Sequence, residues 1–324
     1  MGVRLLVTGR GSIAQRHVRH ARELMPGVEL AVVSGTGELD PALQPCERVA
    51  DFAQGLRWRP DVVIIASVST RHAQELQACL AAGLPCLAEK PLLTRRNEWQ
   101  ALTAAARDAA RTSAVVVGCN LRYLPALDRL AAALRAPQAG ALVRAQFEVG
   151  QDLRQWRPGR DLAHSYSGHA AQGGGVLFDL VHEVDQARWL LGPLTVVGAT
   201  AGRLSSLPID SDDVHVALLR SASGAPVTIG LDYVARPTVR RYAFILEQCT
   251  LVCDLIGRQL TRSTSDGVEQ LASGVDFDVA ATYRTQMADW IASWSDPGHA
   301  VKSPLNQGLD SAELMLRMKE ATTP

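Results

Sequence analysis

In the first 120 residues, short apolar runs rich in β-branched residues alternate with segments whose apolar positions recur every three or four residues. Uninterrupted apolar runs predict strands of a parallel sheet buried on both faces, and the spaced segments predict helices. We therefore expect a doubly wound α/β domain over residues 1–120. Its predicted strands are 3–8, 30–33, 62–67, 85–88 and 114–118, and its predicted helices are 13–24, 70–82 and 97–111.

The pattern changes after residue 120, where apolar residues alternate with polar or small ones between turns rich in Gly, Pro or Ser. Alternation predicts a mainly antiparallel sheet with one face covered. A second domain is expected over residues 121–324, and the sequence leaves open which domain the last helix packs against. The predicted strands are 142–150, 214–219, 227–233, 242–246 and 251–256, and the predicted helices are 176–191, 279–293 and 309–321.

The composition limits the kinds of molecule that the protein is expected to bind. The chain has 33 basic and 33 acidic residues, so its formal net charge is zero and the charge pattern of a nucleic-acid binder is missing. No apolar stretch approaches the roughly 18 residues of a membrane span, and the N-terminus does not read as a signal peptide. The six cysteines lack metal-ligand spacing and are expected to be reduced thiols. We expect a cytoplasmic protein with a small-molecule partner and no metal.

A glycine-rich turn, G-R-G-S-I-A, follows the first predicted strand and opens the first predicted helix. Gly9 permits the tight turn, Gly11 lets a pyrophosphate approach the backbone, and small Ala14 lets helix and strand pack closely. Ser12 and Ile13 begin the helix, whose N-terminal amides attract phosphate. The strand–turn–helix setting predicts a dinucleotide site.

The end of the second predicted strand leaves the choice between NAD and NADP open. An NAD site usually carries an acid there for the ribose hydroxyls, but this chain has Ser34, Gly35 and Thr36. Glu38 and Asp40 come later, in the expected loop. The sequence shows no arginine at this position to bind a 2′-phosphate.

Lys90 stands out because 30 of the 33 basic residues are arginine and only Lys302 and Lys319 share its type. It follows a short apolar run, where a solvated surface charge is not expected. Lysine is a compact ammonium whose pKa moves on burial, unlike the wide arginine fork.

Three motifs in order give a resemblance to a known family: E-K-P at 89–91, V-G-C-N-L-R at 117–122, and a glycine-led segment from 173 that ends in H-E-V-D at 182–185. With the glycine turn, they make the whole chain resemble the Gfo/Idh/MocA oxidoreductases. The resemblance implies a Rossmann domain, then an α/β domain whose open sheet often joins subunits. It implies hydride transfer between NAD or NADP and a carbinol carbon of a sugar or cyclitol, in a homodimer or homotetramer.

The same resemblance implies cofactor contacts beyond the glycine turn. His72 is equally well explained as a surface residue at the start of a helix. The expected cofactor-binding residues are Ser34, Ala66, Ser67, Thr70, His72, Glu89, Lys90 and Asn120.

The resemblance also implies the catalytic residues. His182 is the candidate base for the hydroxyl proton, although on the residues alone it is better explained as a helix histidine satisfied by a neighbour. Lys90 would stabilise the developing alkoxide. Asp179 or Asp185 would orient His182, since each stands three positions from it in the sequence. In many relatives the aspartate stands four positions before the histidine instead. Asp185 could instead pair with Arg188.

Substrate contacts are expected from Lys90, Arg122, Tyr166, Asp179 and His182. The arginine-rich segment 154–160 fits an anionic or nucleotide-linked sugar, or a solvated loop. The leading hypothesis is a sugar or nucleotide-sugar oxidoreductase. A cyclitol or catabolic sugar dehydrogenase and a non-catalytic dinucleotide sensor are the alternatives.

Overall fold

The computed structural model describes residues 2–35, 37–108, 114–156, 162, 165–296 and 298–322. The chain divides into two compact units. The first comprises Met1–Asn120 and Ala280–Leu309, and the second comprises Leu121–Val279 and Asp310–Pro324. The segment Ala280–Leu309, which the sequence analysis placed in the second domain, thus belongs to the first unit.

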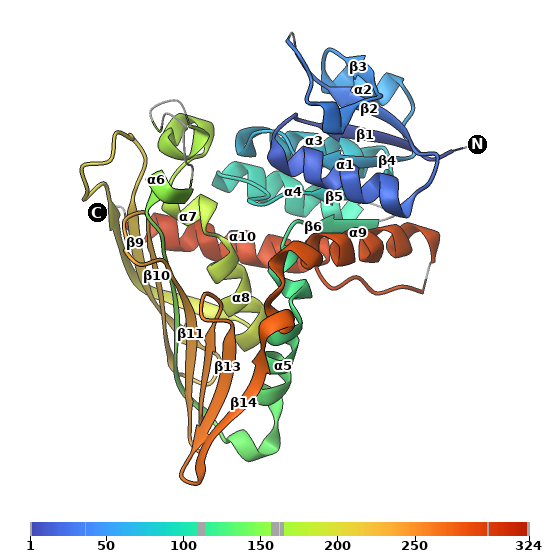
Figure 1. The fold of residues 1–324 in the computed structure, drawn as a ribbon. Helices are drawn as coiled ribbons and strands as arrows, with labels where there is room; N and C mark the ends of the chain where they lie inside the picture. Colours follow the sequence, from blue (N-terminus) through green and yellow to red (C-terminus); the bar gives the residue numbers. More distant parts are fainter. Residues whose placement is uncertain are drawn as a thin grey trace. The chain divides into compact units, whose positions relative to one another are not determined.

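The first unit contains a six-stranded sheet in the order β3-β2-β1-β4-β5-β6, with every pairing parallel (Figure 1). This order is that of a dinucleotide-binding Rossmann fold and confirms the expected class. Its strands are β1 Arg4–Thr8, β2 Glu29–Val33, β3 Glu47–Val49, β4 Val62–Ile65, β5 Cys86–Ala88 and β6 Val115–Val117.

Helices cover the sheet of the first unit. Val18 and Ala21 of α1 share one core cluster with Met287 and Trp290 of α9, so a helix from late in the chain completes this domain. The hydrophobic pattern did not predict β3 or α2. The helices are α1 Ser12–Leu24, α2 Phe52–Arg57, α3 Ser69–Ala81, α4 Arg96–Asp108 and α9 Val279–Ser295, with the 3-10 turn η1 Pro41–Leu43. A second 3-10 turn, η3 Asn120–Tyr123, begins at Asn120 and continues into the second unit.

The second unit is built on an eight-stranded sheet in the order β14-β13-β12-β11-β7-β10-β9-β8. Only the β10–β7 pairing is parallel, so the expectation of a mainly antiparallel sheet is confirmed. Its strands are β7 Leu142–Gly150, β8 Leu194–Gly202, β9 Val214–Ser221, β10 Pro226–Asp232, β11 Val239–Leu246, β12 Thr250–Asp254, β13 Gln259–Thr264 and β14 Gly267–Ser273.

The expected single helix over 176–191 is wrong in one respect, because it is two helices. The chain leaves helical geometry at Leu180 (φ −98°, ψ 29°) and resumes at His182. The two pieces are anchored separately: the Asp179 carboxylate accepts a hydrogen bond from Tyr233, and the Glu183 carboxylate accepts one from Tyr242. The helices of this unit are α5 Pro125–Arg135, α6 Leu153–Trp156, α7 Val176–Asp179 and α8 His182–Leu191.

The last helix, α10 Leu305–Glu320, begins in the first unit and ends in the second. Its first turns contact the first unit, because a Cβ on Gly308 would lie 2.5 Å from the Val117 side chain. Further along, Ser311 and Asp310 bond to residues of α8. In the part of the chain that the structure describes, no helix is both long and apolar enough to cross a bilayer.

Candidate functional site

The turn between β1 and α1 has the geometry of a phosphate cradle. Gly9 adopts φ +84°, and a Cβ there would lie 2.3 Å from the Ala66 carbonyl oxygen, so the fold itself requires glycine. Gly11 is different, since a Cβ there would meet nothing within 4 Å. Its backbone therefore leaves open space in front of α1, which begins at Ser12. The arrangement fits the pyrophosphate of a dinucleotide.

The carboxyl ends of β1 and β4 meet beside this turn. The hydroxyls of Thr8 and Ser67 both donate to Glu75 Oε2 at 2.8 Å, and Glu75 is buried on α3. Ser67 and Thr70, both predicted to contact cofactor, are half-buried here, and Ala66 is buried. Glu75 thus fixes the loop that carries these residues.

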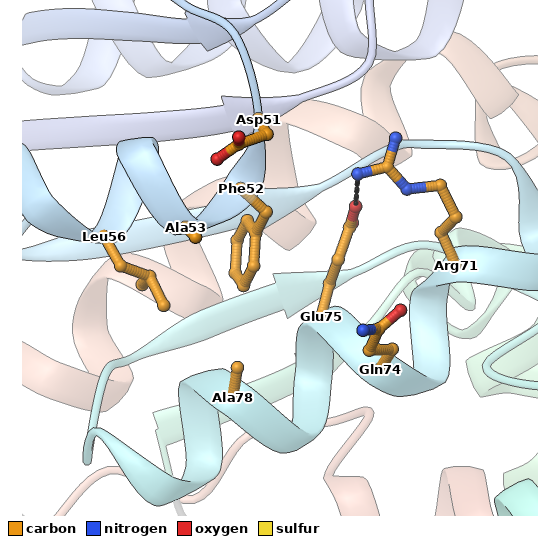
Figure 2. A pocket seen from close by; sticks show the side chains of 8 residues that line it. All are labelled: Asp51, Phe52, Ala53, Leu56, Arg71, Gln74, Glu75 and Ala78. Atoms are coloured by element: carbon orange, nitrogen blue, oxygen red, sulfur yellow. Dashed lines mark ion pairs between the residues drawn. The ribbon is translucent and has the colours of Figure 1, made fainter.

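Glu75 also borders a pocket of about 360 Å³ between α2 and α3. Figure 2 shows the apolar side chains of Phe52 and Leu56 on the α2 side and Arg71 reaching toward Glu75, with the two charged groups 3.1 Å apart. None of the predicted site residues lines it. It is lined by Asp51, Phe52, Ala53, Leu56, Arg71, Gln74, Glu75 and Ala78.

Lys90 is half-buried in the turn that follows β5. Its backbone N–H donates to Glu89 Oε2 at 3.2 Å, and Glu89 Oε1 lies 2.7 Å from His17 Nε2 of α1. Burial raises the pKa of the Glu89 carboxyl, but the hydrogen bond and charge of His17, together with Lys90, outweigh it and leave that pKa lowered. A Cβ at Gly118 would lie 2.9 Å from this carboxylate, so the glycine of the V-G-C-N motif leaves room for it.

Two other predicted cofactor residues hold the surrounding backbone. His72 is buried, with Nδ1 2.8 Å from the Pro91 carbonyl oxygen and Nε2 2.9 Å from that of Ser67. The alternative of a surface residue is therefore wrong for His72. Asn120 is also buried, and its amide donates to Thr282 Oγ1 of α9 at 2.8 Å.

In the second unit, Arg122 and Asp185 form a buried ion pair. The Arg122 guanidinium donates from Nε and Nη2 to the two Asp185 oxygens at 2.9 and 2.6 Å, and Ser311 Oγ donates to Asp185 Oδ1 at 2.9 Å. The alternative pairing of Asp185 with Arg188 is wrong, because Arg188 pairs with Asp310 at 2.8 Å. This contact ties η3 to α8, the helix that carries His182.

His182 is the first residue of α8 and is buried, and the carboxylates around it are engaged. Asp179 accepts a hydrogen bond from Tyr233 at 2.8 Å. Glu183 Oε1 accepts from Arg240 at 2.7 Å and from Tyr242 at 2.8 Å. Burial, and then the Glu183 charge, raise the pKa of the Tyr242 hydroxyl well above its usual range.

The arginine-rich segment is described only in part. Arg154 donates to Asp152 at 3.0 Å, and Arg236 donates to the same buried carboxylate. The rest of the predicted segment, from 157 to 160, lies outside the described residues. Tyr166 is half-buried and begins the 3-10 turn Tyr166–Gly168.

Comparison with known proteins identifies the family. Residues 3–118 match an oxidoreductase family with an NAD-binding Rossmann fold, and residues 128–252 match the GFO/IDH/MocA C-terminal domain. Together the two matches cover more than half of the chain. The chain belongs to the Gfo/Idh/MocA oxidoreductases.

Relatives within the Gfo/Idh/MocA family match this chain over different lengths. Inositol 2-dehydrogenase 2 of Paenarthrobacter aurescens is 28% identical over 317 residues, which span 90% of this chain and 88% of that protein. The rhizopine catabolism protein MocA of Rhizobium meliloti is 32% identical over 58% of this chain and 57% of its own length.

Solved structures share the Gfo/Idh/MocA fold. A levoglucosan dehydrogenase in complex with NADH superimposes with a TM-score of 0.83 at 18% identity, covering 99% of this chain and 97% of that one. UDP-N-acetylglucosamine 3-dehydrogenase from Acidithiobacillus ferrooxidans gives a TM-score of 0.77 at 18% identity, covering 99% and 98%.

Sequence reasoning missed the residues that hold the family motifs in place. His17 holds Glu89, Glu75 holds the loop after β4, and Tyr233 holds Asp179. A weak signal existed for Glu75, because it lies among apolar positions of its helix. His17 and Tyr233 gave none, since their partners are distant in the sequence.

Proposed function

We propose that this oxidoreductase is a dehydrogenase that oxidises a secondary ring hydroxyl of a cyclitol or sugar. The observation that carries the proposal is the 28% identity to an inositol 2-dehydrogenase across 90% of the chain, with Lys90 and His182 at the family's motif positions. A nicotinamide dinucleotide, whose pyrophosphate the glycine turn would hold, would supply the hydride acceptor.

Lys90 and His182 have separate roles at the hydroxyl that is oxidised. As the C–H electron pair leaves as hydride, the hydroxyl proton must also leave so that a carbonyl forms, and His182 accepts that proton. Lys90 donates a hydrogen bond to the same oxygen and stabilises its developing negative charge. Gly9, Gly11, Ser12, Ile13 and Ala14 hold the pyrophosphate.

Asp179 and Asp185 act as positioning residues in this proposal. Each carboxylate is bonded to a residue of another element, Tyr233 and Arg122 respectively. These bonds set the start of α8 and thus the place of His182. Their removal should shift the pH profile of turnover, because the environment of the base would change.

A neutral substrate is favoured over a nucleotide-linked one. The relative that is 28% identical over 90% of this chain is an inositol dehydrogenase, and inositol is a neutral polyol. Of the arginines at 154–160, Arg154 is described, and it shares the single Asp152 carboxylate with Arg236. The nucleotide-sugar alternative is tested by including a UDP-sugar beside cyclitols and free sugars in the substrate panel. Reduction of bound cofactor by any member of the panel excludes the sensor alternative.

The decisive experiment replaces Lys90 by Met. Turnover should fall about a hundredfold to a thousandfold, since removing one donor that stabilises developing charge costs roughly 10²–10³ in kcat, while NAD(H) or NADP(H) still raises the melting temperature. Lys302→Met, which removes another of the three lysines, should leave turnover unchanged. Retained turnover in Lys90→Met contradicts its role, and no thermal shift with any of the four dinucleotides contradicts the cofactor assignment.

Location and assembly belong to the same proposal. All six cysteines are free thiols, which supports a reducing, cytoplasmic location. A homo-oligomer is supported by the outward face of the large sheet, where Val216 and Leu218 of β9 are each 43% exposed.

A further inference from the structure

An arginine that the sequence analysis did not place at the end of β2 lies there in the structure. Arg48 belongs to β3, in register with Val32 of β2. Its Nε donates to Ser34 Oγ at 3.2 Å, and its Nη2 donates to the carbonyl oxygens of Gly35 and Gly37 at 2.7 and 2.8 Å. The position that usually carries an acid for the ribose hydroxyls is therefore held by a guanidinium from the neighbouring strand.

A second guanidinium reaches the same loop from the glycine turn. Nη1 of Arg10 lies 3.2 Å from the point where a Cβ of Gly37 would stand. Arg10, Arg48, Gly35 and Gly37 are all exposed. Two arginines from different turns thus meet solvent beside the same short stretch of backbone.

Among the residues that the structure describes, no carboxylate pairs with Arg48. Its described bonds go to one hydroxyl and two carbonyls, and no carboxylate of the described residues lies within 4.0 Å of it. The Asp40 carboxylate caps η1 by accepting a hydrogen bond from the Ala42 N–H, and the Glu47 carboxylate accepts one from the Trp58 indole. Asp40, Glu47 and the exposed Glu38 keep their charges, but none of them lies within 4.0 Å of Arg48, so this guanidinium has no carboxylate partner among the described residues.

We propose that this loop recognises the 2′-phosphate of a phosphorylated nicotinamide dinucleotide, with Arg10, Arg48 and Ser34 as its ligands. The inference rests on the proposed function, which places the dinucleotide on the glycine turn. A phosphate dianion accepts strong charge-assisted hydrogen bonds from guanidinium groups, and the Ser34 hydroxyl adds a neutral donor. An unphosphorylated ribose would instead need a carboxylate acceptor, which Ser34 does not provide.

The test compares two fragments that differ only in the 2′-phosphate. Isothermal titration of the full chain with adenosine 2′,5′-bisphosphate and with 5′-AMP should show the bisphosphate binding at least about tenfold tighter, as expected for a hydrogen-bonded charge pair. Arg10→Met and Arg48→Met should each lower the bisphosphate affinity about tenfold and change the 5′-AMP affinity less than about twofold. Ser34→Asp should reverse the preference.

Arg22→Met is the matched control, because Arg22 also donates to two backbone carbonyls of this unit, those of Ala42 and Pro45. It should leave both affinities unchanged. Equal or tighter binding of 5′-AMP to the wild type overturns the inference but not the dehydrogenase. Equal weakening of both fragments by Arg48→Met overturns its phosphate contact and makes it a support of the loop alone. If neither fragment nor any dinucleotide binds, the proposed function itself fails.

Discussion

Buried carboxylates in the second unit each accept hydrogen bonds from specific side chains. Asp185 is paired with Arg122, and Glu183 is bonded to Arg240 and Tyr242. Removing a charged group from water is costly unless a partner satisfies it, so such pairs must form together. The helix that carries His182 is therefore fixed by charge as well as by apolar packing.

Arg122→Met should destabilise the protein strongly. The substitution keeps much of the side-chain volume but leaves Asp185 buried without its bidentate partner, which typically costs about 3–5 kcal/mol. Urea denaturation should show a lower midpoint. The double variant Arg122→Met/Asp185→Leu should recover much of the loss, because the stranded charge is gone.

The ion pair between Arg188 and Asp310 is the control for that measurement. It joins the same helix to α10, but both side chains are partly exposed. Asp310→Asn should cost less than about 1 kcal/mol, as expected for a solvated pair. A loss of similar size in Arg122→Met would contradict the buried-pair argument.

His215 should make stability fall in mild acid. It is buried on β9, and burial lowers its pKa to about 4 from the usual 6.5. The unfolded chain takes up a proton below about pH 6.5 and the folded chain only near pH 4, so the contribution is complete above 6.5 and is lost as the pH falls toward 4. The slope is at most about 1.4 kcal/mol per pH unit.

Urea unfolding of the wild type at pH 7.5 and pH 5 measures this loss. His215→Gln should reduce the difference between the two pH values. His20→Gln, which removes a half-buried histidine on α1, should leave the difference as in the wild type. An unchanged difference in His215→Gln would count against the burial of a neutral imidazole.

At the scale of elements, hydrophobic patterning predicted most of the strands and longer helices. It did not predict β8, β13 or α5, although α5 buries Ala126, Leu127, Leu130 and Ala131 at helical spacing. The pattern also failed to predict the edge strands β3 and β14. β14 exposes most of its residues, and β3 has only three residues, two of them charged and exposed, so neither carries an apolar pattern. The break at Leu180 was not predicted either, because the hydrogen bonds that Tyr233 and Tyr242 donate to Asp179 and Glu183 on either side of it are long-range contacts that periodicity does not register.

The candidate site was predictable to a similar depth. The strand–turn–helix setting of the glycine turn indicated Gly9 and Gly11, and the family resemblance indicated Lys90 and His182; all four stay predictions. The supporting contacts were not predictable, since their members lie far apart: His17 and Glu89 are 72 positions apart and become neighbours only in the folded sheet. The arginine at the end of β2 was missed for the same reason, as it comes from the next strand.

The two glycines of the β1–α1 turn should respond differently to alanine. Gly9→Ala places a Cβ 2.3 Å from a backbone oxygen at positive φ, so the melting temperature should fall by several degrees. Gly11→Ala meets open space at an ordinary φ of −72°, so stability should be unchanged. Its methyl would occupy the approach to the pyrophosphate, and dinucleotide affinity should fall at least about tenfold.

Thermal melting and titration with NAD(H) and NADP(H) separate the two effects. Gly298→Ala is the control and should change neither quantity, because the nearest atom to a Cβ there is Asp296 Oδ1 at an ordinary 3.5 Å. Full dinucleotide affinity in Gly11→Ala would mean that the phosphates do not approach this turn.

At the scale of the whole molecule, the large sheet presents one buried and one outward face. Along β9, Ala217 and Leu219 are buried while Val216 and Leu218 point outward. The register continues this outward face onto β8 and β10 with small residues, pairing Val216 with Thr200 and Gly230, and Leu218 with Gly198 and Thr228. Small neighbours leave the surface flat, and a flat surface can pack against a copy of itself.

The size of this face fits a second copy of the chain. Five adjacent strands of about eight residues each give an area of about 27 by 24 Å, or roughly 650 Å². Stable protein interfaces bury about 800 Å² per partner. We therefore expect light scattering after size exclusion to give a mass of at least twice the 34.8 kDa of one chain.

Leu218→Glu should convert the oligomer to a monomer of 34.8 kDa, because each copy would bury a carboxylate without a partner at the centre of the face. The folded state should persist, since Leu218 is 43% exposed and contributes little to the core. Leu204→Glu is the matched control: Leu204 is 77% exposed beyond the end of β8, and its change should leave the mass as in the wild type. A wild-type monomer, or equal dissociation by the two variants, would show that this face does not join the subunits.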